Sequence, residues 1–223
     1  MASAGEHPHQ LRPMICTHGL LSQPDGSALF NQGDTSVIAA VYGPTETRFN
    51  RERIDRATVE VSFMPKIGQP GCAEKTVERT IRAAVESAVI TTLHPRTTFS
   101  IIVQELHDAG SLLVCCINAV CAALLDACAP MRFTIAAVHC AVVDADGTIV
   151  LDPTEKQVVN AIATATFVFD SKTETVLSSV SSGRLSDVHF QTCLAVCRQA
   201  SRQIFDFHRE TYAKRAEACR LIS

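Results

Sequence analysis

The 223-residue sequence contains no tryptophan and only two tyrosines, and it has no excess of positive charge, with 20 basic and 23 acidic residues. A net charge of −3 excludes a chain that attracts nucleic acid by its overall charge, so any such contact must come from local patches or basic neighbours. Because aromatic side chains are scarce, base stacking would have to come from Phe63 or another subunit. Residues 1–10 lack the apolar core of a secretory signal, and no apolar run predicts a membrane-spanning helix.

Metal-ligand spacing is also missing from the sequence. There are ten cysteines but no Cys-x-x-Cys pair, and the histidines are scattered. Cysteines lie inside apolar runs such as 114–117 and 194–197, which predicts reduced thiols in the core of an intracellular protein. We therefore expect no metal site, and we interpret Cys115 and Cys116 as core residues rather than nucleophiles.

What the chain does contain is a regular succession of strand and helix patterns. A polar stretch over residues 1–13 predicts a flexible leader, followed by a single domain over 14–216 and a tail over 217–223. Their order predicts an α+β domain of mixed sheets with two central helices and a C-terminal helix. The expected strands cover 16–20, 27–30, 35–42, 58–63, 97–106, 133–143, 148–151, 160–170 and 175–181, with a turn at 144–147; the expected helices cover 74–93, 111–127 and 185–212.

Four short motifs occur in order along the chain. They are Pro24-Asp25-Gly26-Ser27-Ala28, Gln32-Gly33-Asp34-Thr35-Ser36-Val37, Asp108-Ala109-Gly110-Ser111 and Val150-Leu151-Asp152-Pro153-Thr154. Together they resemble the RNase PH family over about residues 14–212. The resemblance implies an RNase PH-like fold, several copies of which close into a ring that threads single-stranded RNA. Active members cut RNA from its 3′ end with inorganic phosphate, whereas many eukaryotic members keep the fold without the chemistry.

The phosphate-binding positions of the family have changed in this chain. Active members carry a threonine, an arginine and a threonine at the start of the central helix, where a positive helix end and a guanidinium hold the anion. The positions that correspond here are Leu112, Leu113 and Val114. Ser111 remains in front of them, and we expect it to cap the helix rather than to bind phosphate.

The acidic positions of the family are incomplete as well. Active members use two acidic residues six positions apart, which fall here on Asp152 and Val158. Asp152 is expected to bond to backbone N–H groups of its own turn. The loop 67–72, where active members hold a further arginine, contains no basic residue. The resemblance therefore implies a chain without phosphorolytic catalysis and without a cofactor.

Basic residues cluster around the first helix and the loop before it, at Lys66, Lys75, Arg79 and Arg82. In the family this region faces the ring channel, so the resemblance implies that these side chains, Lys75 and Arg79 above all, contact RNA phosphates. Arginines in the loop 48–56 and on the last helix are interpreted as solvated charged faces.

The leading hypothesis is a non-catalytic structural subunit of the RNA exosome core ring, which supports 3′ to 5′ RNA processing and decay, including rRNA processing and mRNA turnover. The implied partners are related ring subunits, exosome cap subunits and single-stranded RNA, without a membrane, in the nucleus, its nucleolus and the cytoplasm. One alternative is a metal-dependent nuclease, alone or as a homodimer, using Asp144, Asp146, Asp152 or Glu155. Another is a phosphorolase completed by an arginine from a neighbour. The isolated chain is expected to form a homodimer but to prefer related partners.

Overall fold

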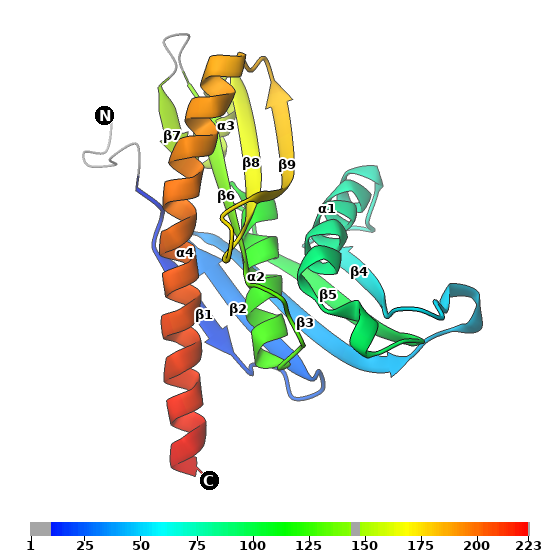
Figure 1. Cartoon of the computed structure of the whole chain (residues 1–223). Helices are drawn as coiled ribbons and strands as arrows, with labels where there is room; N and C mark the ends of the chain where they lie inside the picture. Colours follow the sequence, from blue (N-terminus) through cyan, green and yellow to red (C-terminus); the bar gives the residue numbers. More distant parts are fainter. Residues whose placement is uncertain (1–9, 144–147, 223) are drawn as a thin grey trace.

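The chain forms two β-sheets with two helices between them and a long C-terminal helix across the second sheet (Figure 1). The computed structural model describes residues 10–143 and 148–222, so the turn expected at 144–147 lies outside the described residues. This architecture confirms the predicted α+β class with mixed sheets, two central helices and a C-terminal helix.

The first sheet has five strands in the order β1-β2-β3-β5-β4, antiparallel except for the parallel pair β4 and β5. The predicted hairpin of β2 and β3 is confirmed, and it turns at Gly33, whose φ of 59° suits a residue without a Cβ atom. The strands are β1 (Met14–His18), β2 (Gly26–Gln32), β3 (Thr35–Glu46), β4 (Thr58–Met64) and β5 (Thr97–His107).

The second sheet has four antiparallel strands in the order β7-β6-β8-β9. Its strands are β6 (Ile135–Val142), β7 (Ile149–Leu151), β8 (Ala163–Asp170) and β9 (Val176–Gly183). The helices of the chain are α1 (Cys72–Ala88), α2 (Leu112–Asp126), α3 (Glu155–Asn160) and α4 (Asp187–Ile222), with short 3₁₀ turns at Phe49–Arg51 and Thr91–Leu93.

Helix α2 is the centre of the larger core. It is apolar on all sides because it contacts β2 and β3 of one sheet and β6 of the other. Its one internal polar residue, Asn118, is fully buried and exchanges two hydrogen bonds with the backbone of Ala137 at 2.9 and 3.3 Å. These bonds satisfy the amide and fix the position of α2 against β6.

The motif around Gly26 joins β2 to the end of α2. A Cβ atom at Gly26 would overlap the backbone of Ala127, so the close approach of strand and helix requires glycine. The N–H of Ser27 donates to Asp126 Oδ2 at 3.0 Å, and the N–H of Gly43 donates to Asp25 Oδ2 at 2.8 Å. This motif is therefore a structural device of the fold.

Several helix and strand boundaries differ from the sequence-based prediction. Helix α1 ends at Ala88 instead of residue 93, because Val89 pairs with Met131 and the next N–H donates to Pro130. Strand β1 ends before Gly19, which has a positive φ of 65°. Helix α3 was not expected; a capping box between Thr154 and Gln157 starts it.

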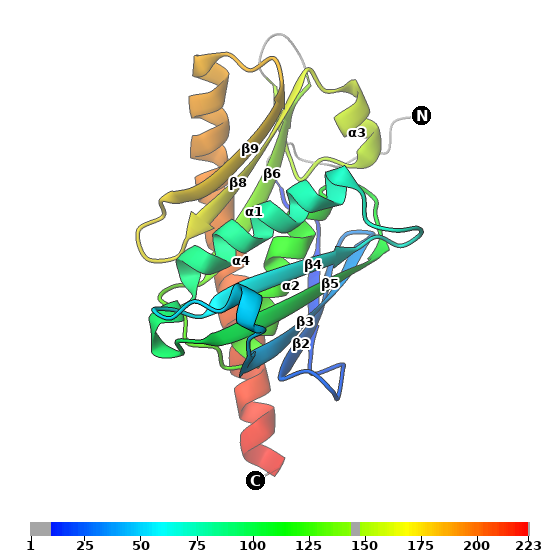
Figure 2. The same ribbon diagram turned by 90° about the vertical axis from the view of Figure 1, so that its right-hand side faces the viewer.

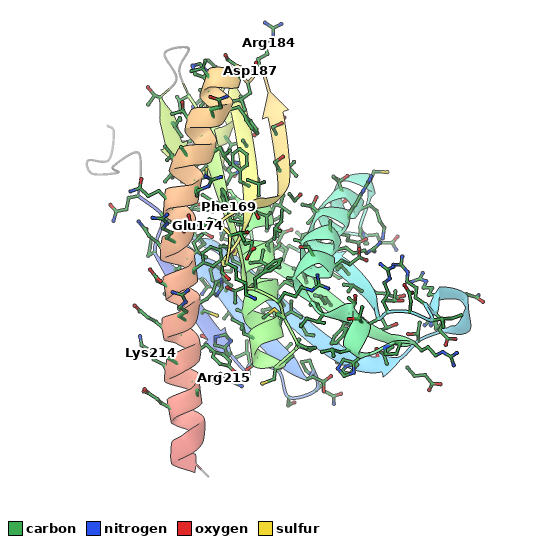
Figure 3. All side chains as sticks on the ribbon, viewed as in Figure 1. Phe169, Glu174, Arg184, Asp187, Lys214 and Arg215 are labelled. Atoms are coloured by element: carbon green, nitrogen blue, oxygen red, sulfur yellow. The ribbon has the colours of Figure 1, made fainter. Side chains whose placement is uncertain are left out.

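Helix α4 extends ten residues beyond its predicted end, since the sequence from 187 to 222 holds neither glycine nor proline to stop it. Its first half packs on the second sheet through Cys193, Cys197 and Ile204. Its second half passes the first sheet, and Lys214 and Arg215 lie in this part of the helix (Figure 3). Arg215 pairs with Asp126 at 2.6 Å and ties α4 to the end of α2.

The ends of the domain also differ from the expected boundaries at 14 and 216. Residues 11–13 do not behave as a leader, because Leu11 is buried in the core under α4 and the carbonyl of Pro13 accepts the N–H of Gly33 at 2.9 Å. At the other end, the backbone of the expected tail continues α4 as far as Ile222.

Side-chain exposure varies among the described cysteines, and Cys16 is half-buried. Six of those described are buried, as expected for core residues, and none of the nine described forms a disulfide. Cys72 and Cys128 are exposed, so the core interpretation is wrong for these two. Over the described ranges, no three histidine, cysteine or acidic side chains meet in a way that could hold a metal ion, and no helix has the length and apolarity to cross a membrane.

Strand β9 forms an open edge of the second sheet (Figure 2). Among the described strands it pairs with β8 alone, and five of its residues from Ser179 to Gly183 are exposed. Its eight residues include no charge and no proline, which are the usual means of blocking such an edge. β9 therefore offers unpaired backbone groups to another chain.

A buried histidine lies where α4 crosses the first sheet. The ring of His208 is 3% exposed and packs beside Phe30 and Phe207, with ring centroids 6.1 Å away in each case. Its Nε2 atom finds no hydrogen-bond partner in the described part of the chain. Burial, with a smaller effect of His18, lowers the pKa of His208 to about 4.

We expect the free energy of unfolding to decrease as the pH falls from about 6.5 to about 4. In this window the unfolded chain binds a proton on His208, whereas the folded chain keeps the ring neutral until its lowered pKa. Each such group lowers stability by up to about 1.4 kcal/mol per pH unit. Urea denaturation of wild type and His208→Gln at a series of pH values measures the effect, with the exposed His107→Gln as control. Identical pH dependence in all three proteins would contradict this assignment.

Candidate functional site

The residues at the expected phosphate-binding positions meet at one hollow of about 250 Å³. Leu112, Leu113 and Val114 form its wall at the N-terminus of α2, and Val158 reaches it from α3. His139 and Thr166 close it from β6 and β8. Positions more than forty residues apart in the sequence therefore converge where the resemblance places them, but as an apolar wall.

Among the described residues, no lysine or arginine lines this hollow, and the charged lining residues are Asp108 and Glu155. Phosphate would meet apolar side chains and two carboxylates there. The ring of His139 shares a hydrogen bond of 2.7 Å with Thr166 Oγ1. Desolvation lowers the pKa of His139 to about 4, so this histidine supplies no positive charge near pH 7.

Ser111 does not cap α2 through its side chain, so that prediction is wrong. Its φ of 59° is left-handed, and its Oγ donates to the carbonyl of Pro153 at 3.1 Å. The backbone carbonyl of Ser111 instead accepts the N–H groups of Val114 and Cys115. The serine fastens the loop before α2 to the turn after β7.

Asp152 is held by a partner that the sequence did not suggest. Its side chain is 1% exposed and forms an ion pair with Arg12, with Nη2 to Oδ1 at 2.6 Å and Nε to Oδ2 at 2.8 Å. Gln32 Nε2 donates to Oδ2 at 2.8 Å. The expectation that Asp152 bonds to its own turn is therefore wrong, because the residue has a φ of 49° and turns its carboxylate into the protein.

Arg12 also connects this ion pair to the loop before α2. Its Nη2 donates to the carbonyl of Gly110 at 3.1 Å, and Thr35 Oγ1 donates to the same carbonyl at 2.7 Å. Burial alone lowers the pKa of the Arg12 guanidinium, but the hydrogen bonds and charge of Asp152 offset this and leave it raised. The Gly33-Asp34-Thr35 motif thus serves to position the loop.

Sequence reasoning missed Arg12, Gln32 and His139 as parts of this region. Arg12 lies in the segment expected to be a flexible leader, and 140 positions separate it from Asp152, so no local pattern marks the pair. Gln32 did carry a signal, because it begins the second of the four motifs. His139 lies among the buried residues of β6 and carries no spacing signal.

The basic residues proposed to contact RNA lie on one exposed stripe of α1. Lys75, Arg79 and Arg82 recur at helical spacing, and Lys66 is exposed in the preceding loop. Arg79 and Lys66 form no ion pair with another described residue. Arg82 opens onto a surface hollow that also contains Glu60 and other acidic groups.

Lys75 has a structural partner. Its Nζ lies 3.0 Å from Glu78 Oε2, and the other oxygen of this buried carboxylate accepts the N–H of Phe63 at 3.0 Å. Glu78 therefore links α1 to β4, and Lys75 compensates its charge. Arg79 has no such partner among the described residues, so its guanidinium is more available to RNA phosphates than the ammonium group of Lys75.

The acidic residues of the nuclease alternative do not form an observed cluster. Asp144 and Asp146 lie outside the described residues. Glu155 is exposed at the hollow, whereas Asp152 is buried in its ion pair and does not line it.

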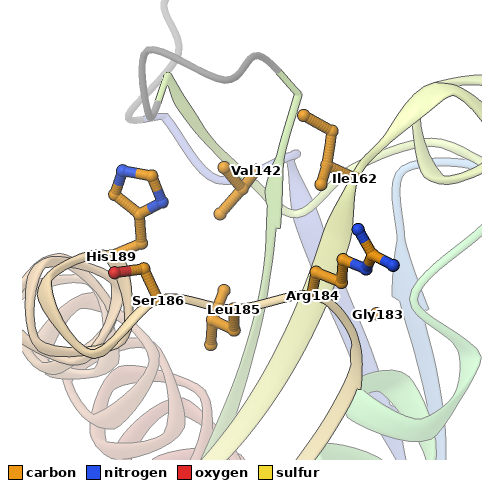
Figure 4. A pocket seen from close by; sticks show the side chains of 7 residues that line it. All are labelled: Val142, Ile162, Gly183, Arg184, Leu185, Ser186 and His189. Carbon is orange, nitrogen blue, oxygen red and sulfur yellow. The ribbon is translucent and has the colours of Figure 1, made fainter.

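A larger hollow of about 550 Å³ lies between the second sheet and the start of α4 (Figure 4). His189 and Arg184 stand on opposite sides of it, over an apolar floor that includes Val142 and Leu185. It contains none of the residues that the sequence singled out.

Comparison with known proteins identifies the family. The model of the 3′ exoribonuclease family matches in both of its parts, domain 1 over residues 10–130 and domain 2 over residues 134–200. The chain belongs to this family, the RNase PH family.

The chain is also similar to named exosome proteins. It is 43% identical over 182 residues to the exosome complex exonuclease RRP46 homolog of Arabidopsis thaliana, covering 80% of this chain and 76% of the relative. The rice homolog is 36% identical over 228 residues, covering 95% of each. The crystal structure of rice Rrp46 superposes with a TM-score of 0.89 at 38% identity, covering 94% of this chain and 98% of that one. An archaeal exosome core shares the fold with a TM-score of 0.80 at 20% identity, covering 92% of this chain and 90% of that one.

We expect Arg12→Ala to lower the free energy of unfolding by about 3–5 kcal/mol, because it leaves the buried carboxylate of Asp152 without a countercharge. The double variant Arg12→Met/Asp152→Asn should recover much of this loss, since no buried charge remains and the amide oxygen still accepts from Gln32. Chemical denaturation measures both. Arg51→Ala, which breaks the exposed pair with Glu60, is the control and should change little. Equal small effects of Arg12→Ala and Arg51→Ala would show that the buried pair does not hold the site.

Proposed function

We propose that this chain is a non-catalytic subunit of the RNA exosome core ring, which supports 3′ to 5′ RNA processing and decay by ring assembly and RNA guidance. The RRP46 homologs of Arabidopsis and rice, at 43% and 36% identity, support a place in the exosome. Within the ring we assign the chain to the subunit called exosome complex component five, on the basis of the four sequence motifs.

The observation that carries this proposal is that the carboxylate of Asp152 is buried and already paired inside the protein. Phosphorolysis needs a carboxyl group that reaches the leaving oxygen and a cation that holds phosphate. Asp152 already accepts hydrogen bonds from Arg12 and Gln32, and no lysine or arginine of the described chain lines the hollow beside it. Both observations support a non-catalytic role for this chain.

The proposed partners follow from the ring. They are related RNase PH-like subunits, the exosome cap subunits and single-stranded RNA that passes along the basic stripe of α1. An archaeal relative of the same fold is described with RNA bound to its active site. We place the complex in the nucleus, including the nucleolus, and in the cytoplasm.

We expect the purified chain, supplied with RNA, magnesium and phosphate, to release no nucleoside diphosphates above background. Leu113→Arg alone should not restore release, because the flanking hydroxyls are absent and Asp152 remains paired with Arg12. Chromatography of the products measures this, with an active member of the family as positive control. Phosphate-dependent release that disappears in Asp152→Asn, with the fold intact by circular dichroism, would overturn the non-catalytic assignment.

We expect RNA binding by the assembled ring to depend on the α1 stripe. Replacing Lys75 and Arg79 by alanine should weaken binding of all sequences alike and reduce the salt dependence by about 0.7 for each RNA phosphate that is no longer neutralised. Because Lys75 is paired with Glu78, Arg79→Ala should account for most of the change. Affinity measured against salt concentration tests this.

The matched control for RNA binding is Arg209→Ala/Lys214→Ala on α4. Arg209 pairs with Asp206 at 3.3 Å and Lys214 is exposed, so their removal deletes the same charge elsewhere on the surface. If both double variants reduce the salt dependence of RNA affinity equally, or neither reduces it, the α1 stripe does not contact RNA in the ring channel.

We expect the isolated chain to form a homodimer and to exchange into a mixed ring when related subunits are co-expressed. The uncharged edge of β9 is open to such pairing, so Val180→Lys should weaken association. Light scattering coupled to size exclusion measures the mass of each species. Ile54→Lys, at another exposed apolar position, is the control. An isolated chain that stays monomeric and does not bind co-expressed ring subunits would refute the ring assignment.

A further inference from the structure

The hollow at the start of α2 has the character of a receptor for an apolar group. Leu112 and Leu113 of α2 and Val158 of α3 line it, and Val159, 79% exposed, extends the apolar surface at its rim. Its volume of about 250 Å³ lies below the range of roughly 300–1,000 Å³ that is usual for small-molecule sites. It suits a single side chain better than a nucleotide.

The hydroxyl groups and the histidine ring around this hollow already form hydrogen bonds inside the protein. Ser111 Oγ donates to Pro153, and His139 shares its Nδ1 bond with Thr166. An anion would therefore find no side-chain cation and no free hydroxyl among the lining residues.

The charged side chains at the hollow all have the same sign. Asp108 and Glu155 are exposed lining residues, and neither forms an ion pair with another described residue. Asp108 Oδ1 accepts the N–H of Gly110 at 2.8 Å, and no cationic side chain balances its charge there. Lys156 faces the neighbouring hollow with Glu155 and does not line this one. Two carboxylates beside an apolar wall attract an aliphatic group that has a cation next to it.

We propose that this hollow binds an aliphatic side chain followed by a lysine or arginine, presented by a segment of another protein. The apolar residue enters between α2 and α3, and its basic neighbour meets Glu155 and Asp108. The hollow therefore prefers a cationic ligand, whereas a phosphate site prefers an anion. The proposal does not depend on whether the chain is a subunit of the ring.

Nuclear magnetic resonance of the full chain with labelled methyl groups tests the proposal. The probes are acetyl-Leu-Arg-amide, acetyl-Leu-Glu-amide and inorganic phosphate. We expect the Leu-Arg probe to shift the methyl signals of Leu112, Leu113 and Val158, and the Leu-Glu probe to bind about tenfold more weakly at low salt. Phosphate should shift none of them.

Two variants distinguish the parts of the site. Glu155→Gln, at an exposed position, should remove most of the preference for Leu-Arg over Leu-Glu, whereas the control Glu210→Gln should not. Val158→Asp should abolish binding of both peptides; if it does not fold, Glu155→Gln decides alone. Phosphate binding at these methyl groups, no shift with Leu-Arg, or an unchanged preference in Glu155→Gln would each overturn the proposal.

Discussion

The buried ion pair between Arg12 and Asp152 fixes the region where the chemistry of this family would occur. It joins the start of the domain to the turn after β7, and its hydrogen bonds extend to Gln32 on β2 and to Gly110 before α2. Removing either charge would leave the other buried and unpaired, at a cost of several kcal/mol. The carboxylate of Asp152 is therefore held in the ion pair, where it stabilises the fold.

The start of α2 is apolar at the positions where active members of the family carry an arginine and two hydroxyl groups. Leu112 and Leu113 pack against the core around α2, and Val158 faces them from α3. An anion site there would need a cation and free hydroxyls, whereas His139 is neutral near pH 7 because its pKa is lowered to about 4. The same backbone thus carries an apolar surface with carboxylates at its edge, which suits contact with protein better than phosphate chemistry.

Sequence patterns predicted what depends on local periodicity. The hairpin of β2 and β3 and the all-apolar α2 were clear, and the four motifs located Leu113 and Val158 on one site. The short α3 was missed because six residues give little periodicity. The roles of Arg12 and Lys75 depend on burial of a distant or neighbouring carboxylate, Asp152 or Glu78, which tertiary packing determines.

Quantitative mass spectrometry of the complex that a tagged chain brings out of cells tests the central claim most directly. If the chain acts through assembly, it should co-elute with related ring subunits and cap subunits in equal numbers. A tagged related ring subunit, purified in parallel, should recover this chain in the same proportion. Recovery of the chain alone or only with itself, while the parallel purification yields a ring that lacks it, would contradict the account.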